Sequence, residues 1–328
     1  MRPAALAELG AFSAVIGDDA EQVQAAGGNT SLKADGLLWV KASGLWLADA
    51  ITRDIFVPVG LAPMLRDIAA DLPDPVTGAV MGALNPEGLR PSIETTLHAL
   101  LPHRVVVHTH SVRTIALAIR EDGEADIARR LTGLRWAWVP YCKPGLPLTR
   151  AVQARLQRTP ADVLVLGNHG LVVGADSIAE ASGLLAEVER RVEAPVERWQ
   201  PVRPQAAPRG TRLPKHDAVH ALALDPLRRD RACGGSLYPD HVIFLGPAAA
   251  VLEQATAAPA SKLLLASGLG AFLAADAGVS ADELALCLAL VLERVPTDAT
   301  LRYLTAADEA ELLDWDAEKY RQALAHSR

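Results

Sequence analysis

The hydrophobic pattern is clearest over 104–110, where three consecutive valines lead to a pair of histidines. A short β-branched run between turn signals is typical of a strand buried on both faces. Because side chains alternate between the two faces of a strand, His108 and His110 are expected to point the same way. Burying two imidazoles is costly unless their nitrogen lone pairs bind a partner, and a divalent metal is the commonest such partner. The pattern therefore predicts two metal ligands at the end of one strand.

A second apolar run covers 163–166 and leads into His169. Gly167 and Gly170 flank this histidine and allow the backbone to turn tightly around it. Together with the pair on the first strand, it would complete a three-histidine site with one position open for a substrate. The other six of the nine histidines lack such a context, so we expect them on the surface or hydrogen-bonded in the core.

The segment 91–101 predicts a helix immediately upstream of the histidine strand. Pro91 followed by Ser92 is typical of a helix start, with Ser92 as the expected N-cap. Glu94 would then lie near the positive end of the helix, where its carboxylate could join the histidines. His98 lies four residues later on the same helical face, so it could orient that carboxylate or simply pack.

Strands and helices alternate over residues 1–195, which predicts a three-layer α/β domain. The proline-rich stretch 196–214 is expected to be a linker, and residues 215–328 a smaller C-terminal α/β lobe. Helices are expected over 4–16, 63–70, 92–101, 114–120, 149–157, 177–192, 281–295 and 308–325, and further strands over 37–41, 135–141, 238–247 and 261–265.

Composition and charge narrow the possible functions. The chain has 328 residues and a net charge of −7, so neither nucleic acid nor an anionic membrane is expected as a partner. The apolar runs are too short to span a bilayer, and we expect no signal peptide. Cys142, Cys233 and Cys287 form no C-x-x-C pair, which fits the reducing cytoplasm. We therefore expect a cytoplasmic protein.

The stretch Gly27-Gly28-Asn29-Thr30-Ser31 predicts a turn. Paired glycines beside Asn and Ser offer N–H groups and side chains that can hold an anion, but an ordinary hairpin turn uses the same residues. On spacing alone, the two interpretations are equal. Lys33 and Lys41 would add positive charge near an anion site, although solvated surface lysines are the default expectation.

Six short motifs occur together over about residues 9–190, and their joint occurrence is specific. They are Gly27-Gly28-Asn29-Thr30-Ser31, Lys41-Ala42-Ser43-Gly44, Pro91-Ser92-Ile93-Glu94, His108-Thr109-His110, Pro140-Tyr141 and Asn168-His169-Gly170. In order and spacing they resemble the class II aldolase/adducin family, and within it the aldolase part of bifunctional rhamnulose-1-phosphate aldolase/lactaldehyde dehydrogenase proteins. The resemblance implies a central, mostly antiparallel sheet with helices on both faces, assembled as a homotetramer with sites between subunits.

The resemblance also implies roles for individual residues. The metal, with zinc as first choice among several dications, would be bound by His108, His110, His169 and Glu94. The substrate and its phosphate would be bound by Asn29, Thr30, Ser43, Gly44 and Ser92. The related sugar-phosphate aldolases commonly carry two adjacent serines before the glutamate, whereas Ile93 follows Ser92 here. One phosphate hydrogen bond is thereby lost, which makes an unphosphorylated sugar an alternative substrate.

These residues predict a metal-dependent retro-aldol cleavage of a ketose or ketose phosphate. A dication chelated by the carbonyl and adjacent hydroxyl of a ketose stabilises the enediolate left when the neighbouring carbon–carbon bond breaks. Glu94 is placed to exchange a proton with that enediolate, and no lysine Schiff base is required. Tyr141 matches a tyrosine that serves as an acid at a neighbouring subunit's site in fuculose-phosphate aldolases. It would protonate or polarise the departing aldehyde oxygen, with a hydroxyl hydrogen-bonded at a strand end as an equal alternative.

Other functions remain open at this stage. In the family, the same site chemistry supports epimerisation of sugar phosphates at carbon 4, decarboxylation and dehydration, and adducin-like relatives keep the fold as a noncatalytic binding module. A purely structural metal site would need a closing fourth ligand, for which Cys142 is the only thiol nearby. No NAD is expected, because the third glycine of a dinucleotide fingerprint is missing after Gly268-Leu269-Gly270.

Overall fold

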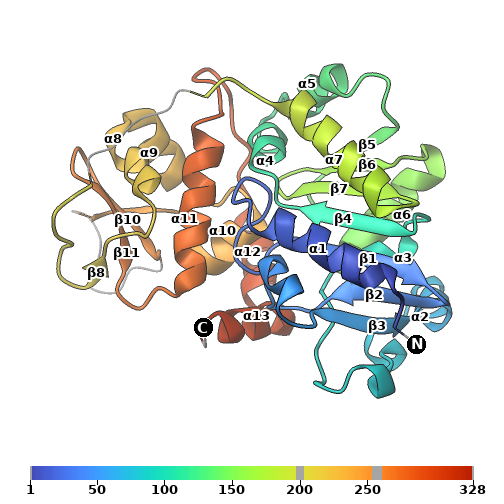
Figure 1. The fold of residues 1–328 in the computed structure, drawn as a ribbon. Coiled ribbons are helices and arrows are strands. Elements are labelled where there is room, and N and C mark those ends of the chain that lie inside the picture. Colours follow the sequence, from blue (N-terminus) through green and yellow to red (C-terminus); the bar gives the residue numbers. More distant parts are fainter. Residues whose placement is uncertain (1, 197–202, 253–260, 327–328) are drawn as a thin grey trace. The chain divides into compact units, whose positions relative to one another are not determined.

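The structure is a computed structural model that describes residues 2–196, 203–252 and 261–326 (Figure 1). It contains two compact units, and each is described here by itself. One comprises Met1–Ser111 and Arg130–Arg191, and the other Val112–Arg129 and Val192–Arg328. The segment Val112–Arg129, expected in the N-terminal domain, therefore belongs to the second unit. The domain limits 1–195 and 215–328 stay a prediction, and the linker expected over 196–214 falls partly on 197–202, outside the described residues.

The first unit is built on a seven-stranded sheet with the order β3-β2-β1-β4-β7-β6-β5. The strands are β1 Asn29–Ala34, β2 Leu37–Lys41, β3 Phe56–Gly60, β4 Val105–Thr109, β5 Trp136–Val139, β6 Val163–Leu166 and β7 Gly170–Ala175. Every neighbouring pair is antiparallel except β5 with β6. The predicted α/β fold with a mostly antiparallel central sheet is therefore confirmed.

β3 is a strand that the sequence pattern did not predict, because Pro58 lies within it. Proline cannot donate a ladder hydrogen bond, so a strand that contains it is expected only at the edge of a sheet. β3 fits this rule: it is the last strand in the order of the sheet, with Pro58 opposite Trp39 of β2, and its outer side forms an isolated bridge between Val59 and Val80. Its position at the edge removes the need for the missing donor.

Helices cover both faces of this sheet (Figure 1). They are α1 Ala5–Gly17, α2 Leu61–Ala69, α3 Thr95–Leu100, α6 Leu146–Arg158 and α7 Ile178–Val192. On one face, the Ser13 hydroxyl of α1 lies 2.7 Å from the Thr30 hydroxyl of β1. On the other, Leu97 of α3 and Leu148 of α6 pack into one apolar cluster with Val106 of β4. Burial against both faces gives the three layers that the alternation predicted.

The second unit contains a four-stranded sheet with the order β8-β11-β10-β9. Its elements are α4 Val112–Ala118, α5 Gly123–Arg130, β8 Thr211–Arg212, α8 Ala221–Leu224, α9 Pro226–Cys233, α10 Pro239–Leu245, β9 Ala250–Val251, β10 Leu263–Ala266, β11 Gly270–Ala274, α11 Val279–Leu292, α12 Ala306–Leu313 and α13 Asp316–His326. The single helix expected over 308–325 is thus two helices. Thr305 begins the first with a capping box, in which its hydroxyl accepts from the Asp308 N–H and the Asp308 carboxylate accepts from the Thr305 N–H.

The strand predicted over 238–247 is wrong, because this segment forms the helix α10. All seven residues of α10 are buried, so no exposed polar face marks this segment as a helix. Periodicity alone cannot separate such a run from a buried strand. Pro239 at the first helical position and Asp240 in the first turn were the signals for a helix start.

The second sheet repeats the half of the first sheet that carries His169. The strand order β4-β7-β6-β5 has its counterpart in β8-β11-β10-β9, with matching parallel and antiparallel pairs. Leu166 faces Gly170 across the first hairpin, and Ala266 faces Gly270 across the second. Leu269 thus stands in the second turn where His169 stands in the first. The repeated hairpin therefore lacks the imidazole that could bind a metal.

The buried His241 of α10 predicts how the stability of the protein depends on pH. Burial lowers the pKa of His241 to about 3, and its Nδ1 accepts a hydrogen bond from the Leu237 N–H. Between about pH 6.5 and 3, an unfolded chain binds a proton at this residue that the folded chain does not, so the free energy of unfolding falls as the pH falls. His241→Asn keeps an acceptor near the Nδ1 position and does not titrate. In urea titrations between about pH 6.5 and 3, the free energy of unfolding of His241→Asn should fall less steeply than that of the wild type, by about 1.4 kcal/mol per pH unit. The same pH dependence in the two proteins would contradict a neutral His241.

Candidate metal centre

The three predicted histidines come together at one end of the first unit's sheet. His108 lies in the middle of the sheet, because its strand β4 pairs Asn29 of β1 on one side and Val172 of β7 on the other. His110 follows the end of β4, and His169 lies in the tight turn between β6 and β7. Because β4 and β7 are antiparallel neighbours, the end of β4 lies beside the start of β7. This arrangement brings together ligands that lie about sixty residues apart in the sequence.

The cluster has the composition and spacing of a metal site. One ligating atom from each of His108, His110 and His169 lies within 4.8 Å of the others. All three side chains are buried, with His108 completely shielded from solvent. Buried imidazoles that converge in this way fit a borderline-soft dication such as zinc better than a hard cation such as calcium. The residues present thus fit a divalent metal.

The hydrogen bond of His108 sets which nitrogen faces the cluster. Its Nδ1 lies 2.9 Å from the carbonyl oxygen of Leu171, an acceptor that requires Nδ1 to carry the proton. Nε2 is then the nitrogen that can offer a lone pair to a metal, and it lies 3.2 Å from the Glu94 carboxylate. A backbone carbonyl that fixes the tautomer in this way is usual for a metal-binding histidine.

Glu94 reaches the cluster from the start of α3, as expected, but the helix begins later than predicted. Ser92 is not the N-cap: α3 begins at Thr95, and Glu94 occupies the cap position. The Ser92 hydroxyl accepts a 3.3 Å bond from the Glu94 N–H, and the Ser92 carbonyl accepts the hydroxyl of Thr95. These two bonds form a turn ahead of the helix, so the N-cap moves two residues along the chain.

The electrostatics of Glu94 favour its charged form. Burial by itself would raise the pKa of Glu94, but the imidazoles of His108 and His169 and a hydrogen bond from Asn29 lower it to about 2. The carboxylate lies 3.2 Å from His108 Nε2 and 3.5 Å from His169 Nε2, and it accepts a 2.9 Å bond from the Asn29 amide. Glu94 is therefore held as an anion against the histidines, where it can serve as a fourth metal ligand. Cys142 instead packs against the apolar cluster between the helices and the sheet.

The turn that carries His169 depends on an asparagine and a glycine, and not on two flexible glycines as expected. Asn168 has the left-handed φ of 51°, a conformation that asparagine tolerates better than most residues. Gly170 is needed for close approach, because a Cβ there would lie 2.4 Å from the Thr109 carbonyl oxygen of β4. This contact brings His169 close to His108 and His110.

Lys41 is buried under the glycine turn, contrary to the default of a solvated surface lysine. Its ammonium donates to the carbonyl oxygens of Ala26 at 2.7 Å and Gly28 at 2.8 Å. Gly28 itself has φ 59°, and a Cβ there would lie 2.9 Å from the His108 carbonyl oxygen. The charge of Lys41 therefore stabilises the loop that leads into Asn29, with its carbonyl groups held inward.

The predicted phosphate-binding residues Ser43, Gly44 and Ser92 lie on two paired segments. An isolated bridge joins Ala42 to Pro91. The Ser43 N–H donates to the Arg90 carbonyl at 2.8 Å, and the Ser92 N–H donates to the Lys41 carbonyl at 3.0 Å. Ser43 and Ser92 are therefore near neighbours, and Gly44 follows with φ 77°. Their contact with a substrate stays a prediction.

Thr30 and Tyr141, two other predicted site residues, lie in different places relative to the histidine cluster. Thr30 belongs to the opposite face of β1 from Asn29, and its hydroxyl pairs with Ser13 of α1. The geometry therefore does not favour a substrate contact for Thr30. Tyr141 follows β5, and a Cβ on Gly167 would lie 3.1 Å from its backbone nitrogen. Tyr141 thus borders the turn of His169, while its role as an acid stays a prediction.

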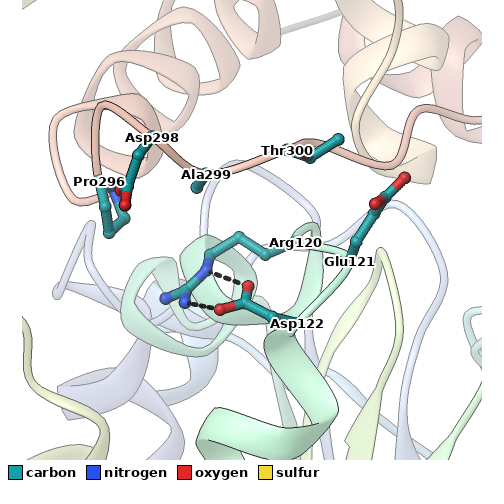
Figure 2. Close-up of a pocket in the computed structure, with 7 residues that line it drawn as sticks. All are labelled: Arg120, Glu121, Asp122, Pro296, Asp298, Ala299 and Thr300. Carbon is teal, nitrogen blue, oxygen red and sulfur yellow. Dashed lines mark hydrogen bonds and ion pairs between the residues drawn. The ribbon is translucent and has the colours of Figure 1, made fainter.

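A polar pocket of about 470 Å³ is a separate feature of the second unit. Figure 2 shows its lining residues, Arg120, Glu121, Asp122, Pro296, Asp298, Ala299 and Thr300. The Arg120 guanidinium is directed at carboxylates, with Nη2 at 2.6 Å from Asp122 and Nη1 at 3.1 Å from Asp126. Its charge is therefore already neutralised within the protein, which leaves an acidic lining unsuited to a phosphate.

Comparisons with known proteins match the part of the chain that contains this cluster. The sequence profile described as "Class II Aldolase and Adducin N-terminal domain" matches residues 11–196. The chain is 31% identical over 192 residues to the "Uncharacterized oxidoreductase YuxG" of Bacillus subtilis (strain 168), a match that covers 53% of this chain and 27% of that protein. It is 29% identical over 171 residues to the "L-fuculose phosphate aldolase" of Methanococcus vannielii, covering 50% of this chain and 80% of that protein.

A solved structure is also similar, that of the N-terminal class II aldolase domain of a conserved protein from Thermoplasma acidophilum. It has a TM-score of 0.49 and 28% identity, with 56% of this chain and 90% of that chain covered. Within the described part of this chain, no helix is long and apolar enough to cross a membrane. The profile match covers more than half of the chain and includes every predicted site residue. The chain belongs to the class II aldolase/adducin family.

Proposed function

We propose that the chain is a metal-dependent aldolase that cleaves a ketose or ketose phosphate at its three-histidine centre. The observation that carries the proposal is the convergence of three buried imidazoles with the Glu94 carboxylate at 3.2 Å from His108 and 3.5 Å from His169. When bound, a dication would polarise the substrate carbonyl as a Lewis acid. Zinc is the proposed ion, because three imidazoles and a carboxylate suit it.

The protein's own residues would orient the substrate and move protons. Glu94 would exchange a proton with the carbon next to the carbonyl, and its hydrogen bond to Asn29 fixes the carboxylate for this task. Ser43, Gly44 and Ser92 would hold the phosphate of the sugar, in keeping with the fuculose-phosphate aldolase relative. Tyr141 would act on the oxygen that becomes the aldehyde: it would receive the proton of that hydroxyl during cleavage and return it in the reverse, condensation direction. We further propose a cytoplasmic homotetramer without NAD.

Glu94→Gln tests the proposal, because it removes the charge and basicity of the carboxylate but keeps an oxygen for Asn29 and the metal. The wild-type protein should release aldehyde from at least one ketose or ketose 1-phosphate in a substrate panel. The variant should keep most of its metal while its kcat falls by about 10³-fold, as loss of a general acid/base does. No aldehyde release by the metal-loaded wild type would contradict the aldolase assignment. An isomer inverted at carbon 4, or released carbon dioxide, would then identify an epimerase or a decarboxylase.

A further inference from the structure

Three side chains on one face of β1 each form a hydrogen bond with α3. The Asn29 amide donates to Glu94 at 2.9 Å, the Ser31 hydroxyl lies 2.7 Å from Nδ1 of His98, and the Lys33 ammonium donates to a carbonyl oxygen at the end of the helix, that of Leu101. We call these three contacts the β1–α3 ladder. It begins at the proposed metal ligand Glu94 and extends along the whole helix.

The spacing of the ladder follows from the two backbone repeats. Alternate residues of a strand share a face and lie about 6.6 Å apart. Residues three or four apart in a helix share a face and lie about 4.5–6 Å apart along its axis. The helix partners are four and then three residues apart, so every second residue of the strand meets the next turn of the helix. The match fixes both the rotation of α3 about its axis and its position along β1.

The central contact lies fully within the protein. Ser31 and His98 are both completely shielded from solvent. Burial lowers the pKa of His98 to about 3, so its imidazole is neutral and contributes a hydrogen bond rather than a charge beside Glu94. A buried hydrogen bond between two neutral groups is directional, and neither partner can exchange it for water.

α3 needs such contacts, because it has only six residues. A helix of this length has no appreciable stability of its own and takes its position from what it packs against. Its apolar residue Leu97 packs against the sheet and α6, but apolar contacts tolerate sliding and rotation. Directional bonds to β1 remove that freedom.

We propose that Ser31 and His98 are positioning residues, which hold α3 so that the Glu94 carboxylate reaches the metal. This inference rests on the proposed function, since it assumes that Glu94 is a metal ligand. Ser31→Ala and His98→Leu should each weaken metal affinity by about tenfold or more, the usual effect of removing a group that orients a ligand. Compared with His98→Leu, His98→Asn should keep much more of the metal affinity, because its side-chain amide lies near the Nδ1 position and can still form a hydrogen bond with Ser31.

The matched control is Ser13→Ala, which removes an equally buried hydroxyl from α1 on the opposite side of β1. It breaks the bond to Thr30 and leaves the ladder intact. We expect unchanged metal affinity for this variant, even where its free energy of unfolding falls as much as that of Ser31→Ala. A comparison of the two variants therefore separates positioning of Glu94 from general loosening of the sheet.

The experiment measures the zinc dissociation constant by chelator competition, the visible absorption of the cobalt-loaded protein and the urea unfolding of each metal-free variant. The inference predicts weaker zinc binding and an altered cobalt spectrum for Ser31→Ala and His98→Leu. For Ser13→Ala, it predicts a zinc affinity and a cobalt spectrum close to those of the wild type. Wild-type affinity in the two ladder variants, or equal weakening in the control, would overturn it. A wild-type protein that binds no metal would overturn the proposed function as well, so the two failures are distinguishable.

Discussion

His108→Ala is expected to lose nearly all bound metal and, with it, catalytic activity. His108 is the completely buried member of the cluster, fixed by the Leu171 carbonyl on one side and facing Glu94 at 3.2 Å on the other. Four ligands supply about 10–16 kcal/mol of zinc affinity in small proteins, so one ligand is worth about 3 kcal/mol. Its loss should weaken binding by more than about 100-fold. Elemental analysis after dialysis should then find little metal in the variant.

His103→Gln is the matched control for this experiment. His103 is also buried and belongs to the same unit, but it pairs with Asp162 at 2.8 Å and is not part of the three-histidine group. The control should keep the metal content and activity of the wild type. Metal retained by His108→Ala at the level of this control would show that the ligands lie elsewhere, and the proposed mechanism would fail with it.

Gly170→Ala is expected to lower the free energy of unfolding by about 1–3 kcal/mol. The added Cβ would lie 2.4 Å from the Thr109 carbonyl oxygen, which is backbone and cannot rotate away. Overpacking of this kind costs about 1–3 kcal/mol. Relief would require the turn to move away from β4. His169 would move with it, so metal affinity should fall together with stability.

The control for this prediction is Gly183→Ala. Gly183 lies in α7 with nothing within 4 Å of its would-be Cβ and with an ordinary backbone conformation. Alanine there should raise stability by about 0.5–1 kcal/mol, because it restricts the unfolded chain and favours the helix. Urea unfolding of the metal-free proteins measures both changes. A Gly170→Ala variant as stable as the wild type would contradict the close packing of the turn on β4.

The candidate site was predictable because its signals are local. A β-branched run specifies a buried strand, alternation along a strand gives His108 and His110 a common direction, and Asn-His-Gly after a second strand indicates a tight turn. The same reasoning predicted that Glu94 would lie at the start of a helix, although not which residue caps it. What these patterns lacked was the order of the strands, which depends on pairings between distant segments.

The sequence by itself determined the helices of the first unit, four strands of its sheet (β2, β4, β5 and β6) and the three histidines of the candidate metal centre, because the period of apolar residues and the choice of turn residues act over a few positions. Tertiary structure decided what distant neighbours control. It made 239–245 a helix by burying every side, placed the proline-containing strand β3 at an edge, and drew Lys41 under the glycine turn because three carbonyl groups there require donors. It also joined Ser31 to His98, a pairing no local pattern encodes, since it depends on how a strand and a helix 67 residues apart come to lie together.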